Sequence, residues 1–140
     1  MDLRTSASLI STLLISFFMA SSAFGQNPQR HFCLLTDGQF FAISLEGDLP
    51  GVCVQGSALI DSLSLMLKVT GDSETQAIKA LSTGLDCFQL GGKVLYSADP
   101  AFSSTAICGF QDKSFVGALS LGKVPTGHND QLLKALSQKF

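Results

Sequence analysis

The sequence predicts an α+β domain built by tandem duplication of one unit, in which each copy forms four strands followed by a helix (ββββα). Three observations predict it: an internal repeat spaced by about 55 residues, two cysteines in each copy, and strand-like runs that end in helical periodicity. A single unit of this size has too small a core to fold comfortably alone. We therefore expect a mostly antiparallel sheet and two helices packed into one domain.

The N-terminal segment, residues 1–25, predicts a signal peptide. Its apolar run, Leu9–Ala20, is interrupted by serine and threonine, whereas a membrane-spanning helix needs about 20 apolar residues. The small residues of Ala23–Gly25 favour cleavage before Gln26. We expect a secreted or periplasmic protein without a membrane anchor, whose mature chain begins with a flexible segment, residues 26–31.

The internal repeat sets the domain organisation. Gln76–Ser82 recurs as Gln131–Ser137, about 55 positions later. Three further pairs follow the same register to within one position: Cys33 and Cys87, Gly38 and Gly92, and Cys53 and Cys108. We assign repeat 1 to residues 32–84 and repeat 2 to residues 85–140, as parts of one integrated domain.

Strands are expected first in repeat 1. Residues 31–36 and 39–45 are apolar runs around Asp37-Gly38, a typical hairpin turn. Residues 52–55 follow as a third strand. Residues 58–69 fit both an alternating strand pattern and a helical face. The aligned residues 114–121 are rich in Phe, Val and Gly, so we interpret 58–69 as a strand.

Repeat 2 is read in the same way, with strands over 87–90, 93–97, 105–110 and 114–121. Each copy then ends in a helix. In repeat 1, Asp72 or Ser73 can cap a helix that ends at Gly84. In repeat 2, the expected helix starts near Asn129 and Asp130 and continues towards the C-terminus.

The four cysteines predict two disulfides, because an even number in an exported chain usually forms bridges. A unit that paired its cysteines before it was copied would give Cys33–Cys53 and Cys87–Cys108. Pairing of Cys33 with Cys87 or Cys108 remains the alternative. The sequence has no Cys-x-x-Cys pair and two isolated histidines, so we expect no metal and no cofactor.

The net charge and the motifs of the sequence limit the classes of function that we expect. A formal net charge of −2 does not favour nucleic-acid binding, which needs a basic face. With 14% charged residues, apolar surface can stay exposed and serve as an interface, including one between two copies in a homodimer. No catalytic motif is present, and His31 and His128 are better explained by a strand edge and a helix cap than by catalysis. We do not expect an enzyme.

Candidate binding residues lie in the two connections whose lengths differ between the copies. Glu46 and Asp48 lie in the first connection, and Asp99 and Phe102 lie in the second. We expect an exported, disulfide-stabilised binding protein, inhibitor-like or effector-like, that acts on a protein partner without catalysis. The alternative is a carrier of a small apolar ligand in a Phe-lined cavity between sheet and helices.

Overall fold

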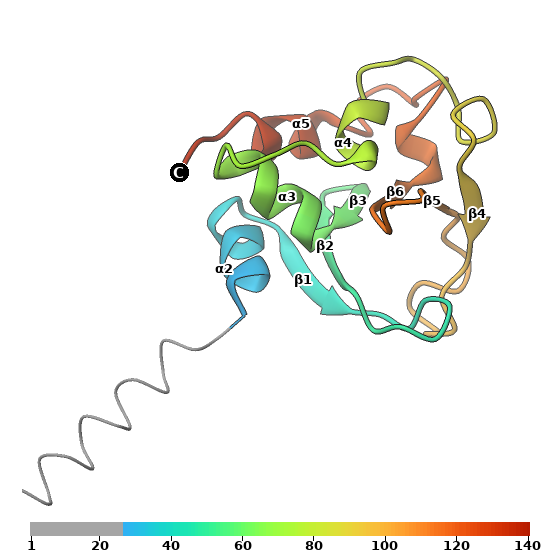
Figure 1. The fold of residues 1–140 in the computed structure, drawn as a ribbon, viewed down its shortest axis with the longest axis horizontal. Coiled ribbons are helices and arrows are strands. Elements are labelled where there is room, and N and C mark those ends of the chain that lie inside the picture. The colour runs from blue at the N-terminus through green and yellow to red at the C-terminus, as the bar shows by residue number, and fades with distance from the viewer. Residues whose placement is uncertain (1–26) are drawn as a thin grey trace, which may run out of the picture.

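The computed structural model describes residues 27–140, so the predicted signal peptide and its cleavage point before Gln26 lie outside the described residues. The described residues form one α+β domain, with a six-stranded antiparallel open sheet and four α-helices (Figure 1). The elements in chain order are α2 (Pro28–Leu35), β1 (Gln39–Ala42), β2 (Gly51–Gln55), β3 (Ala58–Asp61), α3 (Ser62–Val69), α4 (Gln76–Ala80), β4 (Lys93–Leu95), β5 (Ile107–Gly109), β6 (Phe115–Gly117), a 3-10 turn η1 (Ala118–Ser120) and α5 (Asp130–Leu136).

The sheet consists of two three-stranded halves. Its order is β1-β2-β3-β6-β5-β4, so each half contributes three strands that are consecutive in sequence and one edge of the sheet. The halves meet where β3 pairs with β6, and the register there aligns Ile60 with Val116. The predicted antiparallel sheet is confirmed, but the expected eight strands are wrong, because the described residues form six.

The first correction concerns residues 31–36, which lie in helix α2 and its C-terminal end rather than in a strand. Asn27 caps the helix by accepting the Gln29 N–H at 3.0 Å, and Pro28 occupies the first turn, where its missing N–H costs nothing. The helix therefore begins inside residues 26–31, the segment that we expected to be flexible. The inward side of α2 includes polar Gln29 and Thr36, which bond to Ser62 and Gln55, so apolar periodicity did not reveal it.

The second correction concerns residues 58–69. The strand ends at Asp61, and residues 62–69 form helix α3. Asp61 causes the switch, because its carboxylate accepts the Ser64 N–H at 2.8 Å and so caps the helix. Leu65 and Val69 then face the core at a spacing of one helical turn. The strand interpretation holds only for the first four residues of the segment.

The second half of the sheet also differs from the prediction. Residues 87–90, expected as a strand, form a turn closed by a hydrogen bond from Gly92 N to Cys87 O at 2.9 Å. Strands β5 and β6 are shorter than the expected 105–110 and 114–121. The two predicted C-terminal helices are confirmed as α4 and α5, although α4 is shorter than the expected 73–84.

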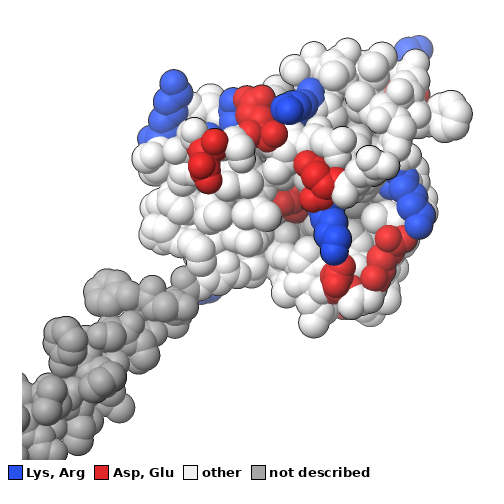
Figure 2. Space-filling model, viewed as in Figure 1, with Lys and Arg blue, Asp and Glu red and all other residues white. Residues whose placement is uncertain are grey.

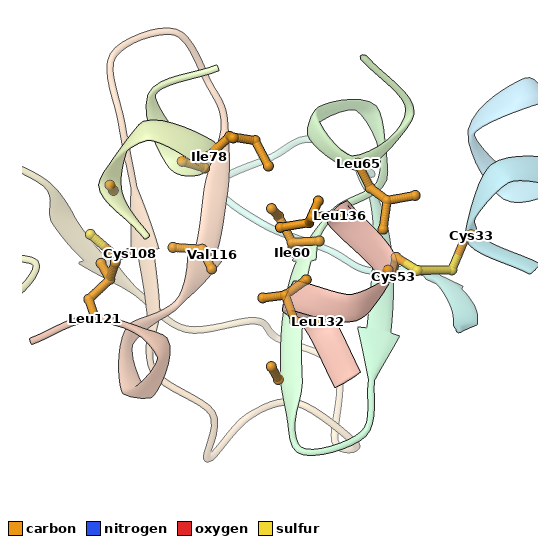
Figure 3. Close-up of a cluster of buried hydrophobic side chains, with 14 of the residues drawn as sticks. Cys33, Cys53, Ile60, Leu65, Ile78, Cys108, Val116, Leu121, Leu132 and Leu136 are labelled. Atoms are coloured by element: carbon orange, nitrogen blue, oxygen red, sulfur yellow. A yellow bond between two sulfur atoms is a disulfide. The ribbon is translucent and has the colours of Figure 1, made fainter. Parts of the chain in front are cut away.

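The helices cover one side of the sheet, which we call the helix face; Cys53, Ile60, Val116 and Cys108 point towards it. In Figure 3, Ile60 and Val116 lie at the centre of this core, with Leu132 and Leu136 of α5 beside Ile60. The burial of each large aliphatic side chain contributes about 1.5–3 kcal/mol. The opposite side, the loop face, carries a second buried cluster of Ile43, Leu45, Val52, Leu59, Ile107 and Phe115.

The predicted disulfide pairing is confirmed. Cys33–Cys53 joins α2 to β2 with a Cα–Cα distance of 5.6 Å, and Cys87–Cys108 joins the 87–90 turn to β5 at 5.7 Å. Each bridge therefore ties a helical or turn segment, not a first strand, to the middle strand of its half. Neither bridge links the two halves.

Each disulfide lies over a glycine. A Cβ on Gly38 would be 2.5 Å from Cys53 Sγ and 2.9 Å from Cys33 Sγ. A Cβ on Gly92 would overlap Cys108 Sγ and lie 2.9 Å from Cys87 Sγ. Glycine is thus required at both positions because the sulfur atoms occupy the side-chain space.

Within residues 27–140, no helix is long and apolar enough to cross a membrane.

Candidate binding groove

The connection between β1 and β2 is a long hairpin that crosses the loop face. Beyond β1, Ile43 N donates to Pro50 O at 3.0 Å, and Leu45 and Asp48 exchange two hydrogen bonds of 3.0 Å. Glu46 and Gly47 form the tip with φ of 49° and 83°, the left-handed backbone that a two-residue hairpin turn requires. We call residues 45–50 the hairpin tip; it extends beyond the ends of β1 and β2.

The hairpin tip reaches the second half through an ion pair. Glu46 Oε1 lies 2.8 Å from Lys93 Nζ on β4, and both side chains are largely exposed. An exposed pair of this kind contributes little to stability, about 0–1 kcal/mol. Its consequence is positional, because it sets the tip beside the edge strand of the other half.

The connection between β4 and β5 reaches back to the first half. Asp99 Oδ2 accepts the Ser44 N–H at 2.6 Å, and Ser97 Oγ donates to Ser44 O at 2.7 Å. Phe102 packs edge-on against Phe41 with ring centroids 5.4 Å apart. Asp99 and Phe102 therefore fasten the two connections to each other.

A groove of about 680 Å³ opens on the loop face between the hairpin tip and strands β4, β5 and β6; we call it the hairpin groove. Its apolar lining comes from both halves: Leu45, Leu49, Pro50, Leu95, Phe110 and Phe115. Charged residues also line it, with Glu46 and Asp48 from the tip and Lys93 and Lys113 from the second half. Leu49 is 76% exposed.

Gly109 lies in the lining at the centre of the second half. Leu95 lies directly over it, since a Cβ on Gly109 would come within 2.8 Å of Leu95 Cδ1. In the first half, Val54 follows Cys53 as Gly109 follows Cys108, and Val54 packs into the loop-face cluster. The place of the Val54 side chain in the first half is thus taken in the second half by Leu95, which lies over Gly109.

The surface charges are mixed. In the view of Figure 2, Lys, Arg, Asp and Glu are scattered, often with opposite signs side by side, and no large area of one sign is visible.

Asp112 lies next to the groove. It accepts hydrogen bonds from the Oγ and N–H of Ser114, which lines the groove, and from Gln76 N at 2.9 Å. Partial desolvation raises the pKa of Asp112, but these hydrogen bonds outweigh it and lower the pKa overall.

The four predicted binding residues separate into two groups. Glu46 and Asp48 line the hairpin groove, whereas Asp99 and Phe102 hold the connections together and are absent from its lining. Sequence reasoning missed Lys93, Gly109 and Phe115. The substitution of glycine for valine in the repeat alignment was the signal that could have revealed Gly109.

The Phe-lined cavity was expected between sheet and helices, but the helix face is filled by the core, and the groove lies on the loop face. His31 is exposed on α2, and among residues 27–140 no three of the His, Cys, Asp and Glu side chains are close enough to hold a metal ion.

No family model, curated protein or solved structure matches this chain.

Proposed function

We propose that this chain is an exported binding protein that receives an apolar segment of a protein partner in the hairpin groove. One observation carries the proposal: an apolar floor lies open to solvent beside the exposed Leu49, with charges of both signs around it. Two disulfides agree with an oxidising compartment, either periplasmic or extracellular.

The size of the occupant follows from the shape of the groove. Sites for small molecules usually bury about 70–90% of the ligand surface. The hairpin groove is open along one side, so it suits a side chain or short segment that is anchored elsewhere on a larger partner. The charges at its rim, Glu46 and Asp48 against Lys93 and Lys113, would orient that segment and add little affinity.

We also propose that the two halves descend from one duplicated unit of three strands and a terminal helix. Matching hydrogen bonds support this origin, since Gly38 N donates to Cys33 O and Gly92 N to Cys87 O, both at 2.9 Å. The halves then diverged at Val54 and Gly109. In this proposal the hairpin tip of the first half and strands β4, β5 and β6 of the second half form the groove together.

The proposal is tested by capturing partners from the compartment into which the protein is exported. Immobilised wild type is compared with Leu49→Asp, which places a charge at the groove, and with Gly109→Val, which displaces Leu95 into it. Leu133→Asp is the matched control, because Leu133 is 51% exposed on α5 and does not line the groove. We expect a protein that the wild type and Leu133→Asp retain and that both groove variants lose. Equal recovery by all four proteins would refute the proposal.

A carrier of a small apolar ligand is the second candidate. It is favoured by the groove volume of about 680 Å³, which lies within the usual range for ligand pockets, and by the lining Phe110 and Phe115. Native mass spectrometry of the isolated protein decides between the two. A non-protein adduct present on the wild type and missing from Gly109→Val would favour the carrier.

Binding without catalysis is part of the proposal. What supports this is that the described residues lining the hairpin groove include no His, the side chain that most often serves as a general base, and no Cys. A panel of hydrolase substrates tests this point. Turnover that is abolished by His31→Ala or His128→Ala would overturn it.

A further inference from the structure

The outer edge of β4 presents backbone groups without a partner. Phe110 N donates to Ser114 O at 2.9 Å and Ala118 N donates to Ala106 O at 2.8 Å, so the intervening Cys108 also directs its N–H and C=O towards β6. Val94 pairs with Cys108 and must therefore point its own N–H and C=O away from β5. No hydrogen bond from another described residue reaches them. In Figure 1, no helix or strand lies outside β4.

The opposite edge of the sheet is protected just beyond the end of β1. The same alternation makes the backbone of Ser44 face outwards, but Asp99 and Ser97 bond its N–H and C=O at 2.6 and 2.7 Å. Phe102 covers Phe41 on the same edge. Exposed edges are usually protected in this way because they template pairing with another chain. Phe40 and Ala42 on β1 also face outwards by this alternation, so β4 is distinguished by the exposed apolar side chains around it and not by its unpaired backbone alone.

Apolar side chains gather around β4. Phe88 is 90% exposed in the turn before the strand, Val94 is 49% exposed at its centre, and Tyr96 is 60% exposed just after it. The charge on the strand, Lys93, is already paired with Glu46 of the same chain. An edge with exposed apolar side chains and little net charge favours strand addition.

We propose that β4 pairs antiparallel with β4 of a second copy of this chain, which makes one continuous twelve-stranded sheet across a twofold axis at Val94. Antiparallel pairing about that axis sets Val94 opposite Val94 of the second copy, and the outward N–H and C=O groups of the two copies bond to each other. It also sets Lys93 opposite Leu95, and Tyr96 opposite Gly92.

The register is self-complementary, which is why a second copy fits this edge. Like charges do not face each other, because Lys93 meets an apolar residue. The large Tyr96 ring meets Gly92, so it faces the backbone and the Cys87–Cys108 disulfide above it and not another bulky side chain. A specific interface buries about 1,000 Å² or more, so Phe88 and Tyr96 must extend the contact beyond the strand. This inference does not depend on the hairpin groove.

Sedimentation equilibrium of the mature chain tests the inference. We expect a dimer at about 100 µM and a dissociation constant at least about tenfold weaker in Val94→Lys, since two ammonium groups would face each other on the axis. Val94→Pro should also dissociate the dimer, because it removes the outward N–H without breaking the β4–β5 ladder.

Ala42→Lys is the matched control, since Ala42 is an exposed position on β1, the opposite edge strand. It should remain a dimer. Circular dichroism of each variant confirms that the monomers are folded. A wild type that stays monomeric at about 100 µM, or a dimer that Val94→Lys and Ala42→Lys affect equally, would overturn the inference and leave β4 to an extended segment of another protein.

Discussion

The carboxylate of Asp61 accepts a hydrogen bond from the backbone N–H of Phe115, with 2.9 Å between Asp61 Oδ2 and Phe115 N. Asp61 ends β3, and Phe115 begins β6, so this bond lies where the two halves of the sheet meet. Beside it, the register aligns Ile60 with Val116. One buried side chain thus caps helix α3 and completes the junction.

The first prediction is that Asp61→Ala lowers the free energy of unfolding by about 3 kcal/mol. Alanine loses the helix cap, worth about 1 kcal/mol, and leaves the buried Phe115 N–H without a partner, which costs about 1–3 kcal/mol. Asp61→Asn should cost less, because its amide oxygen can still cap α3. Urea denaturation measures both, and equal losses for the two variants would contradict the assigned roles.

The second prediction concerns pH. Desolvation by burial raises the pKa of Asp61, and it outweighs the hydrogen bonds from Ser64 and Phe115 that lower it. The folded state therefore holds this proton at a higher pH than the unfolded chain does. The stability that Asp61 contributes is complete below the unfolded pKa and is lost as the pH rises through the folded pKa.

The difference in unfolding free energy between wild type and Asp61→Asn, followed from pH 3 upwards, isolates this contribution. We expect it to shrink as the pH rises. Asp112→Asn is the control of opposite sign, because the pKa of Asp112 is lowered and its contribution is lost as the pH falls. A difference that grows with pH for Asp61→Asn would be inconsistent with a raised pKa.

Much of the fold could be predicted from the sequence where residue type and spacing act locally. The α+β class, the antiparallel pairing and both disulfides were predicted, the last because Cys33 and Cys53 recur at the same spacing as Cys87 and Cys108. Helix α2 could not be predicted from periodicity, because Gln29 occupies an inward position and is satisfied by Ser62, a residue distant in sequence.

The groove was less accessible to prediction, because it depends on which residues face each other across the two halves. Glu46 and Asp48 were chosen because loops commonly bind ligands, and both line the groove. Asp99 was chosen for the same reason, and in the structure its carboxylate accepts the backbone N–H of Ser44; backbone partners leave no trace in residue types. Gly109 matters only because Leu95 lies over it, a contact that the sheet register creates.

The third prediction is that the two disulfides stabilise the domain to a similar degree. They close spans of 20 and 21 residues, for which chain entropy gives about 3 kcal/mol each. The double variants Cys33→Ala/Cys53→Ala and Cys87→Ala/Cys108→Ala should each lose about that amount in urea denaturation. A bridge whose removal costs nothing would argue against the entropic account for that half.

The fourth prediction concerns the N-terminus, which lies outside the described residues. The small residues before Gln26 predict that the exported chain begins there, and an N-terminal glutamine can cyclise to pyroglutamate. Intact-mass measurement of protein recovered from outside the cytoplasm should match residues 26–140. A mass that corresponds to all 140 residues would exclude cleavage.

The fifth prediction couples Gly92 to the disulfide above it. Gly92→Ala should lower the free energy of unfolding by about 3 kcal/mol, because its Cβ would overlap Cys108 Sγ and crowd Cys87 Sγ in a close-packed site. Without the sulfur atoms, the nearest remaining neighbour of the same methyl group is the backbone oxygen of residue 87, at 3.2 Å. In the Cys87→Ala/Cys108→Ala background, the substitution should therefore cost less than about 1 kcal/mol, a coupling of about 2 kcal/mol between neighbouring sites.

Gly109→Ala is the control. Its Cβ would come closest to the flexible end of Leu95, at 2.8 Å, and the substitution should cost about 1 kcal/mol in either background. Thiol titration of each unfolded variant shows whether the bridge has formed. Equal costs of Gly92→Ala in both backgrounds would show that the backbone, and not the sulfur atoms, requires glycine at this position.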